Sequence, residues 1–262
     1  MSPATHWQGE PIATWESVWG VPGVEAWSSI DSTNLRAREL VRGGARPWTV
    51  VIAEEQTAGR GRAGRPWASP AGEGIWFSVV TPASEGALLV LPLRVGAAVA
   101  RVVRNLGGAE QVGLKWPNDL WWRDRKLGGI LCEAVGERAV AGVGLNLHAP
   151  GGEGFDTRPV GLTEIVGDRV SPARLIGEFV SRMRIEVEGG APRLSAREVE
   201  HLRECDILAD RAVRCEPGPG GIARGVAPDG ALRIETGRGE RKLYAGTVRP
   251  IGPPPRPSGD VG

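Results

Sequence analysis

The first half of the chain switches between helix-like and strand-like patterns of apolar positions. A helix is expected between the polar N-cap candidates at 31–34 and the glycines at 43–44, because the apolar positions between them share one helical face. Residues 48–56 and 75–80 carry short apolar runs that are typical of buried strands. A longer apolar helix is expected over about 88–106. Helices and strands therefore alternate in this half.

The residues that follow predict four strands between 112 and 147 and then two helices. The connections between the four strands are short, which favours antiparallel hairpins. A glycine-rich loop at 150–161 leads to helices around 172–187 and 195–204. Together with the first half, this pattern predicts an α+β fold in which helices pack on a mixed, largely antiparallel sheet.

Changes in the pattern divide the chain. Residues 1–26 contain glycines and prolines whose spacing leaves room for one short helical turn but not for two consecutive helices, so we expect an N-terminal preamble. The main domain is expected at 27–205. Short alternating runs separated by Pro-Gly and Asp-Gly turns then predict a small C-terminal β-barrel at 206–251. The proline-rich end at 252–262 predicts a disordered tail.

The composition limits the classes of partner. The 262 residues carry 32 basic and 31 acidic side chains, and a net charge of +1 gives no global field that would favour nucleic acid or an anionic membrane. The apolar stretches fall short of the ~20 residues that span a bilayer, and the N-terminus lacks the pattern of a signal peptide. The three cysteines and three histidines show no metal-ligand or disulfide spacing. We therefore expect a cytoplasmic protein with no nucleic-acid or membrane partner.

The sequence GRGRAG at 59–64 formally matches the GxGxxG dinucleotide-binding pattern. That pattern must open a helix, yet the prolines and glycines at 66–74 forbid one, and the GxxxxGK[ST] pattern is absent. What remains is a flexible loop whose glycines let the backbone approach a ligand and whose Arg60, Arg62 and Arg65 can hold a phosphate. A solvated hairpin loop with an incidental basic cluster is the alternative.

Lysine is scarce in this chain. Only Lys115, Lys126 and Lys242 occur among the 32 basic residues. Since lysine is a compact point charge and arginine a planar fork, a site that needs the former cannot accept the latter. Lys115 begins the sequence KWPND, which places Asn118 and Asp119 at a proline turn, and Lys126 begins a later strand. The alternatives are an ordinary β-turn and a solvent-facing lysine.

Uncharged polar residues stand at the ends of several predicted elements. The Ser32-Thr33-Asn34 run caps a helix, and the free N–H groups and hydroxyls at a helix start can also face a pocket. Gln56 ends a strand; an exposed strand end is the alternative. Asn146 lies in an otherwise apolar strand, where a buried amide needs a hydrogen-bond partner such as an adenine edge.

Five motifs occur in a fixed order: STN, EEQTAGRGRAGRPW, KWPNDL, RKLGGILCE and GVGLNL. In this order they resemble the bacterial biotin–protein ligase family, also called biotin–[acetyl-CoA-carboxylase] ligase, over roughly residues 27–250. The paired GRGRxGR and KWPND motifs are highly specific. The resemblance implies a class II synthetase-like catalytic domain at 27–205, the monofunctional type without an N-terminal DNA-binding domain, and a homodimer formed through sheet edges.

The resemblance also implies an activity and its site. The enzyme would use ATP and Mg²⁺ to convert biotin to biotinoyl-5′-AMP, and would then transfer biotin to a lysine of a biotin carboxyl carrier protein of acetyl-CoA carboxylase or a related carboxylase. Its biotin-binding residues would be Ser32, Thr33, Asn34, Gln56, Arg60, Gly61, Arg62 and Lys126. Its nucleotide-binding residues would be Trp67, Lys115, Asn118, Asp119 and Asn146, with Asp119 also a metal ligand. Its catalytic residues would be Lys126, Arg62 and Lys115.

Three other functions are weighed against this one. Some family members also repress transcription through an N-terminal helix-turn-helix, for which residues 1–26 lack room. A lipoate or octanoyl ligase of related fold would be expected to carry the RRxGGGxVxHD motif, which is missing. A non-catalytic biotin-binding module would leave the lysines without a role.

Overall fold

The main body of the molecule is a seven-stranded sheet. The computed structural model describes residues 2–84, 86–152, 157–168, 170–187 and 191–252. The strands follow the order β3-β4-β5-β9-β8-β7-β6 across the sheet. Their bounds are β3 (Val24–Ile30), β4 (Val50–Gln56), β5 (Gly74–Pro82), β6 (Val112–Lys115), β7 (Asp119–Trp122), β8 (Arg125–Val135) and β9 (Arg138–Asn146). The four strands from β6 to β9 pair as antiparallel neighbours, which confirms the expected hairpins.

Strand β3 is the main departure from the expected sheet. It pairs in parallel with β4, whereas β4 and β5 are antiparallel. The connection between β3 and β4 contains helix α2 (Thr33–Arg42), as a crossover between parallel strands requires. This βαβ unit brings the first turn of α2 close to the carboxyl end of β4, where Gln56 lies.

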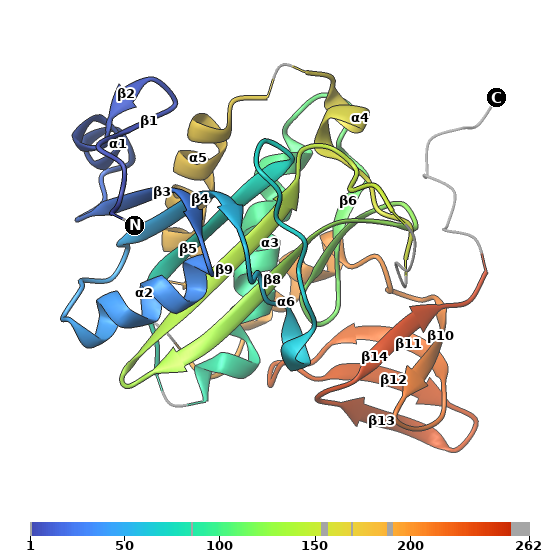
Figure 1. Cartoon of the computed structure of the whole chain (residues 1–262). Helices are drawn as coiled ribbons and strands as arrows, with labels where there is room; N and C mark the ends of the chain where they lie inside the picture. Colours follow the sequence, from blue (N-terminus) through green and yellow to red (C-terminus); the bar gives the residue numbers. More distant parts are fainter. Residues whose placement is uncertain (1, 85, 153–156, 169, 188–190, 253–262) are drawn as a thin grey trace.

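Helices cover both faces of the sheet (Figure 1). On one face, α2 packs Ala37 against Val51 and Ala53 of β4. On the other face, α3 (Leu91–Arg104) and α5 (Pro172–Val187) share a large core with the alternate residues of the strands, among them Ile52 and Phe77. The mixed α+β architecture is therefore confirmed.

The N-terminal residues pack onto this body. They form β1 (His6–Trp7), β2 (Glu10–Pro11) and one helix, α1 (Ile12–Trp19). The Trp7 and Trp19 rings meet edge to face with centroids 6.0 Å apart, and both belong to the core beneath α3 and α5. Within the described residues 2–26, α1 is the only helix, where a helix-turn-helix would need two.

Five strands at the opposite end of the chain form a second sheet (Figure 1). These are β10 (Ala212–Glu216), β11 (Gly221–Val226), β12 (Leu232–Thr236), β13 (Gly239–Leu243) and β14 (Thr247–Pro250). All their pairings are antiparallel, in the order β13-β12-β11-β10-β14. The expected small β-barrel is not confirmed, because β13 and β14 stand at the two edges of this order and do not pair with each other within the described residues. Of the expected tail at 252–262, all but Gly252 lies outside the described residues.

The C-terminal sheet is joined to the main sheet through a shared apolar core. Leu114 of β6 and the fully buried Trp116 pack with Val213 and Leu232 of the small sheet. The Trp116 Nε1 donates a hydrogen bond of 2.9 Å to the carbonyl oxygen of Gly230. The motif that contains Lys115 is therefore held against the C-terminal sheet.

Short helices fill the remaining connections. Helix α4 (Leu162–Val166), which the sequence pattern did not indicate, follows the glycine-rich loop, and α6 (Ala196–Cys205) precedes the C-terminal sheet. The segments η1 (Arg62–Gly64) and η2 (Ala87–Leu89) are single 3-10 turns. None of the described helices combines the length and apolar character needed to cross a bilayer.

Candidate active site

A cavity of about 700 Å³ lies over the carboxyl end of β4 and the middle of β8 and β9. All thirteen side chains and glycines expected at the site line it: Ser32, Thr33, Asn34, Gln56, Arg60, Gly61, Arg62, Trp67, Lys115, Asn118, Asp119, Lys126 and Asn146. They come from segments up to 114 residues apart in the sequence, so the sheet topology is what brings them together. The volume falls within the range of about 300–1,000 Å³ that is usual for ligand pockets.

The charged centre of the cavity is a carboxylate between two lysines. Asp119 Oδ1 lies 2.8 Å from Lys126 Nζ, and Asp119 Oδ2 lies 3.8 Å from Lys115 Nζ. The three residues meet because β7 pairs with β6 on one side and with β8 on the other, and Asp119 is directly opposite Lys115. The cavity therefore holds a cluster with a net positive charge.

Each lysine also rests against an aromatic ring. Lys115 Nζ is 5.0 Å from the centre of the Trp121 ring, and Lys126 Nζ is 5.2 Å from that of Trp67. Both distances allow a cation–π attraction. Lys115 is buried, and this burial lowers the pKa of its ammonium, while Asp119 opposes the shift.

The arginine loop, residues 58–69, folds over the lysines. Its turn is built by Ala63 and Gly64, both with positive φ, at 55° and 71°. Arg62 Nη1 donates a hydrogen bond of 3.1 Å to Asn118 Oδ1, while Asn118 Nδ2 donates to the carbonyl oxygen of Ile130 at 2.7 Å. Burial lowers the pKa of the Arg62 guanidinium. The loop is thus tied to the turn that carries Asp119.

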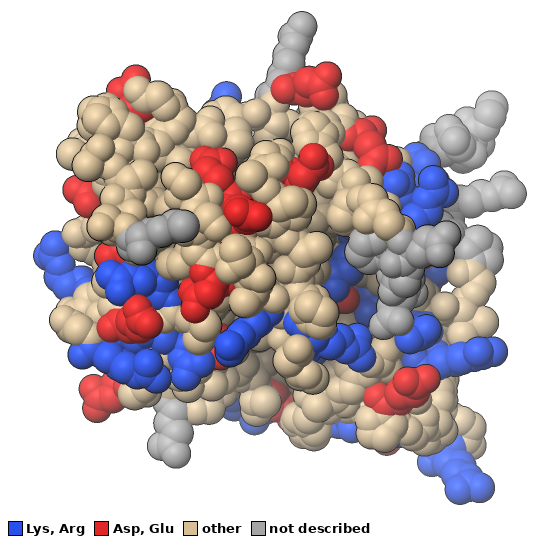
Figure 2. Space-filling model, viewed as in Figure 1, with Lys and Arg blue, Asp and Glu red and all other residues tan. Residues whose placement is uncertain are grey.

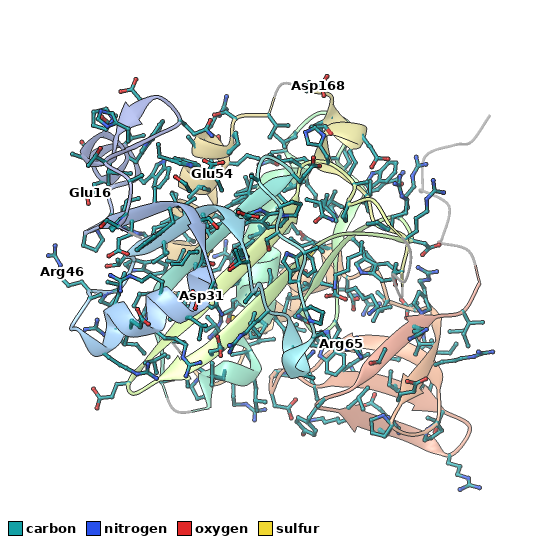
Figure 3. The ribbon with its side chains drawn as sticks, viewed as in Figure 1. Glu16, Asp31, Arg46, Glu54, Arg65 and Asp168 are labelled. Carbon is teal, nitrogen blue, oxygen red and sulfur yellow. The ribbon has the colours of Figure 1, made fainter. Side chains whose placement is uncertain are left out.

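Figure 3 places Arg65 on the part of the loop that faces the C-terminal sheet. On the surface, basic side chains gather between the main sheet and this second sheet, with acidic ones interspersed (Figure 2). The charge of the site is therefore local, in keeping with the near-neutral chain.

Trp67 forms a wall of the cavity and depends on two glycines. A Cβ on Gly144 would lie 2.6 Å from Trp67 Nε1, and a Cβ on Gly129 would lie 3.5 Å from the same ring. Behind Trp67, the Trp76 ring meets it edge to face with centroids 6.4 Å apart. The absent side chain at Gly144 is what allows the indole to lie against the sheet.

The other end of the cavity is polar but uncharged. The Thr33 backbone N–H and hydroxyl both donate to Gln56 Oε1, at 3.0 and 3.1 Å. Ser32 occupies the N-cap position of α2, yet its side chain makes no capping hydrogen bond. The expected cap is therefore wrong in its side-chain contact, and the buried Ser32 hydroxyl lines the cavity instead.

Asn146 joins the cavity to the loop that follows β9. It is buried, and its Nδ2 donates to the carbonyl oxygen of Val160 at 3.3 Å. The same loop pairs with the backbone of Lys126, which donates to Arg158 and accepts from Val160. Among the described residues, none donates a hydrogen bond to the amide oxygen of Asn146, so that oxygen can accept one from a ligand.

The C-terminal sheet supplies lining residues that the sequence analysis missed, namely Ala245, Gly246, Thr247 and Arg249. Arg249 lies close enough to Lys115 to contribute to the lowering of its pKa, after burial and the Lys126 charge. The run that contains these residues has the same alternation as the neighbouring strands, so the sequence carries no signal that sets them apart.

The donor set of the cavity does not build a metal centre from the protein alone. Asp119 is the single carboxylate among the described lining residues, and both lysines already contact it. Over the part of the chain that the structure describes, no three His, Cys, Asp or Glu side chains are grouped to hold a metal ion. A divalent cation would need most of its ligands from a bound substrate.

Comparison with known proteins gives concordant results. The model of the Biotin/lipoate A/B protein ligase family matches residues 27–149. The chain is 35% identical over 246 residues to the biotin–[acetyl-CoA-carboxylase] ligase of Mycobacterium tuberculosis, covering 88% of this chain and 90% of that protein. It is 37% identical over 228 residues to the bifunctional ligase/repressor BirA of Escherichia coli, covering 79% of this chain and 67% of that protein.

A solved structure shows the same fold. The biotin protein ligase of Aquifex aeolicus in complex with biotin and ATP superposes with a TM-score of 0.75 at 23% identity, covering 88% of this chain and all of that one. Together with the 35% identity to a ligase of nearly the same extent, these likenesses establish that the chain belongs to the biotin–protein ligase family.

Proposed function

We propose that this protein uses ATP to convert biotin to biotinoyl-5′-AMP and then transfers the biotinoyl group to a lysine of a biotin carboxyl carrier protein. The observation that carries the proposal is the pairing, in one cavity, of an uncharged polar end with a cluster of fixed cations. Biotin has a neutral urea at one end and a carboxylate at the other, so it would span the two.

In the first step the biotin carboxylate attacks the α-phosphorus of ATP, forming an acyl–phosphate bond as pyrophosphate leaves. Two anions must approach each other, and at about 4 Å unit charges repel by about 1 kcal/mol in water but about 4 kcal/mol at an effective dielectric constant near 20. Lys126 would contact the carboxylate and the α-phosphate, and Arg62 would close over both. Their charges are already held in position, so little reorganisation is needed.

The remaining expected residues divide between the two ends. Thr33 and Gln56, with Ser32 and Asn34, would bind the urea and thiophane rings of biotin, and Arg60 and Gly61 would cover them with the loop. Trp67 would pack against the nucleotide, and Lys115, Asn118 and Asp119 would lie along its phosphates. Asn146 would accept or donate at the adenine edge through the part of its amide that Val160 leaves available.

Mg²⁺ would enter with the nucleotide. It commonly binds through substrate phosphates, several waters and one or two carboxylates, and Asp119 is the carboxylate that this cavity offers. When bound, the ion would neutralise charge on the phosphates. The two lysines compete for the same carboxylate, so we assign Asp119 no more than a shared role.

In the second step the neutral amine of the acceptor lysine attacks the acyl carbon, the acyl–phosphate bond breaks, AMP leaves and a proton passes to solvent or base. Biotinoyl-AMP is a mixed anhydride that water would hydrolyse, so the arginine loop would exclude solvent until the carrier binds. We assign the catalytic domain to residues 27–205 and a supporting C-terminal domain to 206–251. A cytoplasmic location and a homodimer stay predictions.

Incubation with biotin, MgATP and a biotin carboxyl carrier domain, followed by intact-mass analysis, tests the proposal. We expect one biotinoyl group on the carrier and release of AMP and pyrophosphate. Parallel reactions with lipoate or octanoate separate the related ligase activity, and a gel shift with biotin-operon DNA tests the repressor alternative. Biotin binding without ATP turnover would favour the non-catalytic module and contradict the proposal.

A further inference from the structure

Ser78 is a fully buried hydroxyl beside the uncharged end of the cavity. It lies on β5, and its Oγ is 2.8 Å from Thr33 Oγ1 and 2.7 Å from Asn34 Oδ1. The backbone of β5 is already paired with β4 and β9 at this position, so the sheet does not need the hydroxyl. Burial of a hydroxyl costs free energy unless the hydroxyl is hydrogen-bonded. The contacts with Thr33 and Asn34 offset this cost for Ser78.

Glu133 fixes the orientation of the Asn34 amide. Asn34 Nδ2 donates to Glu133 Oε2 at 2.8 Å and to the carbonyl oxygen of Leu131 at 3.2 Å, which uses both of its N–H groups. The amide oxygen must therefore point at Ser78. The other carboxylate oxygen of Glu133 accepts from Arg38 Nη1 at 3.0 Å on the outer side of α2.

The Gln56 amide is oriented in the same way from the opposite side. Its Nε2 donates to Ser69 Oγ at 2.8 Å, and the Ser69 hydroxyl donates in turn to the carbonyl oxygen of Trp67 at 3.3 Å. Gln56 Oε1 must then face Thr33, from which it accepts two hydrogen bonds. The Ser78 hydroxyl has one proton, and Asn34 Oδ1 can only accept it, so the Thr33 hydroxyl donates either to Gln56 Oε1 or to Ser78 Oγ. In both arrangements the Thr33 proton is used within the network, and a lone pair of Thr33 Oγ1 stays free to accept.

Gly142 of β9 makes room for this network. A Cβ at this position would lie 2.1 Å from Asn34 Oδ1, closer than any side chain permits. The carboxamide and the strand backbone therefore lie in direct contact, with Ser78 beside them. No rotation of Asn34 is open without loss of these contacts.

We propose that Ser78 and Glu133 are positioning residues that hold the Thr33 and Asn34 side chains in the one orientation that binds the cyclic urea of the substrate. This inference rests on the proposed function. Ser78 lies outside the five motifs, and Glu133 is the last residue of RKLGGILCE, but the resemblance assigns a role to neither. Neither residue lines the cavity, and Glu133 acts through Asn34. The network turns a threonine hydroxyl, which could donate or accept, into a fixed acceptor for a urea N–H.

Ser78→Ala tests the inference against a matched control, Thr81→Val. Thr81 is also fully buried on β5, but its hydroxyl donates to the carbonyl oxygen of Ala139. Titration calorimetry with biotin alone should show that Ser78→Ala binds about ten- to a hundredfold more weakly, since a partner left unsatisfied in a buried site costs that much. Thr81→Val should lower the melting temperature and leave biotin affinity unchanged.

Glu133→Ala and Arg38→Ala separate positioning from general stability. Glu133→Ala should weaken biotin binding by about tenfold, because the Asn34 amide loses its charged acceptor. Arg38→Ala leaves the Asn34–Glu133 hydrogen bond in place and should bind biotin as the wild type does. In the pyrophosphate-release assay, Ser78→Ala and Glu133→Ala should raise the KM for biotin while kcat and the KM for ATP stay within about twofold.

The outcomes are distinguishable from those that test the proposed function. If the wild-type protein does not bind biotin, the proposed function fails. If it binds biotin and Ser78→Ala binds equally well, the positioning inference alone is overturned. A loss of kcat without a change in the KM for biotin would also overturn it, because that pattern would place Ser78 in the chemical step. Equal losses in Ser78→Ala and Thr81→Val would reduce Ser78 to a structural role.

Discussion

The ammonium of Lys126 is held 2.8 Å from the carboxylate of Asp119, in a cavity that we propose receives two further anions. This ion pair holds the Lys126 side chain in position before the substrates arrive. When the biotin carboxylate and the α-phosphate enter, the Lys126 ammonium exchanges its contact with Asp119 for contacts with these two groups. The exchange replaces one anionic partner by others, which lowers the desolvation cost of binding. Asp119 then stays balanced by Lys115.

Replacement of Lys126 by alanine should reduce the rate of adenylation by about 10²–10³-fold, the usual loss for one preorganised charge donor. The change removes the cation that we place between the biotin carboxylate and the α-phosphate. It also removes the cation–π contact between Lys126 and the Trp67 ring. Pyrophosphate release with biotin and MgATP measures the effect. Lys242→Ala is the control, because Lys242 is exposed and bound to Asp229 at 2.7 Å. A wild-type rate in Lys126→Ala would exclude the assigned role.

The pH dependence of adenylation should report on Lys115. Burial lowers its pKa below the ordinary value of 10.5, so its charge is lost at a lower pH than that of an exposed lysine. We expect kcat/KM for ATP to fall as the pH rises through this lowered pKa. Lys115→Arg keeps a cation that does not titrate, so its alkaline limb should move to higher pH even if its maximum rate is lower. Rate profiles from about pH 7 to about pH 10 measure this, and an unmoved limb would contradict the prediction.

The same burial has a consequence for stability. Because the folded protein disfavours the Lys115 ammonium, the unfolded chain holds that proton more tightly. The contribution of Lys115 to the free energy of unfolding should therefore rise as the pH increases from the lowered pKa to 10.5. Denaturant titrations at several pH values in this window give the free energy of unfolding of the wild type and of Lys115→Met. The free energy of unfolding should rise more steeply with pH for the wild type than for Lys115→Met. If the two free energies of unfolding changed with pH in parallel, burial of the Lys115 ammonium would carry no cost in stability.

Replacement of Arg62 by glycine should let the intermediate escape. The Arg62 side chain ties the arginine loop to Asn118 on the turn beside the lysines, so its loss unfastens the loop. We expect release of free biotinoyl-AMP in the absence of carrier to rise by about tenfold, the value of one charge-assisted hydrogen bond. Chromatography of the reaction mixture measures it. The matched control is Arg238→Gly, in the exposed turn between β12 and β13, which should retain the intermediate as wild type does.

Much of the sheet could be predicted from the sequence because its central strands are buried and strongly apolar. The hairpins from β6 to β9 follow from short connections. Strand β3 was not predicted, because it is an edge strand in which buried and exposed positions are mixed. Its parallel pairing with β4 depends on where α2 crosses the sheet. Local periodicity carries no information on such a crossover.

The sequence motifs were sufficient to predict the expected residues that line the cavity. They were not sufficient to predict the residues that hold those side chains in place. Lys115, Asp119 and Lys126 stand in sequence patterns specific enough to name in advance. Ser78 lies in an ordinary strand sequence, and Glu133 ends the RKLGGILCE motif but receives no role from that pattern. The register of β5 and β8 brings both to Asn34. The contribution of Arg249 likewise depends on how Trp116 anchors the C-terminal sheet, which no local pattern encodes.

Replacement of Gly144 by alanine should weaken nucleotide binding more than biotin binding. The new methyl group would lie 2.6 Å from Trp67 Nε1, so the indole must leave its place against β9. Overpacking of this kind costs about 1–3 kcal/mol, and we propose that Trp67 contacts the nucleotide, so the KM for ATP should rise by about tenfold. Gly107→Ala is the control, since a Cβ there meets nothing within 4 Å. Steady-state rates with varied ATP and varied biotin separate the two ends of the cavity. A rise confined to the KM for biotin would show that Trp67 contacts biotin and not the nucleotide, which would contradict the prediction.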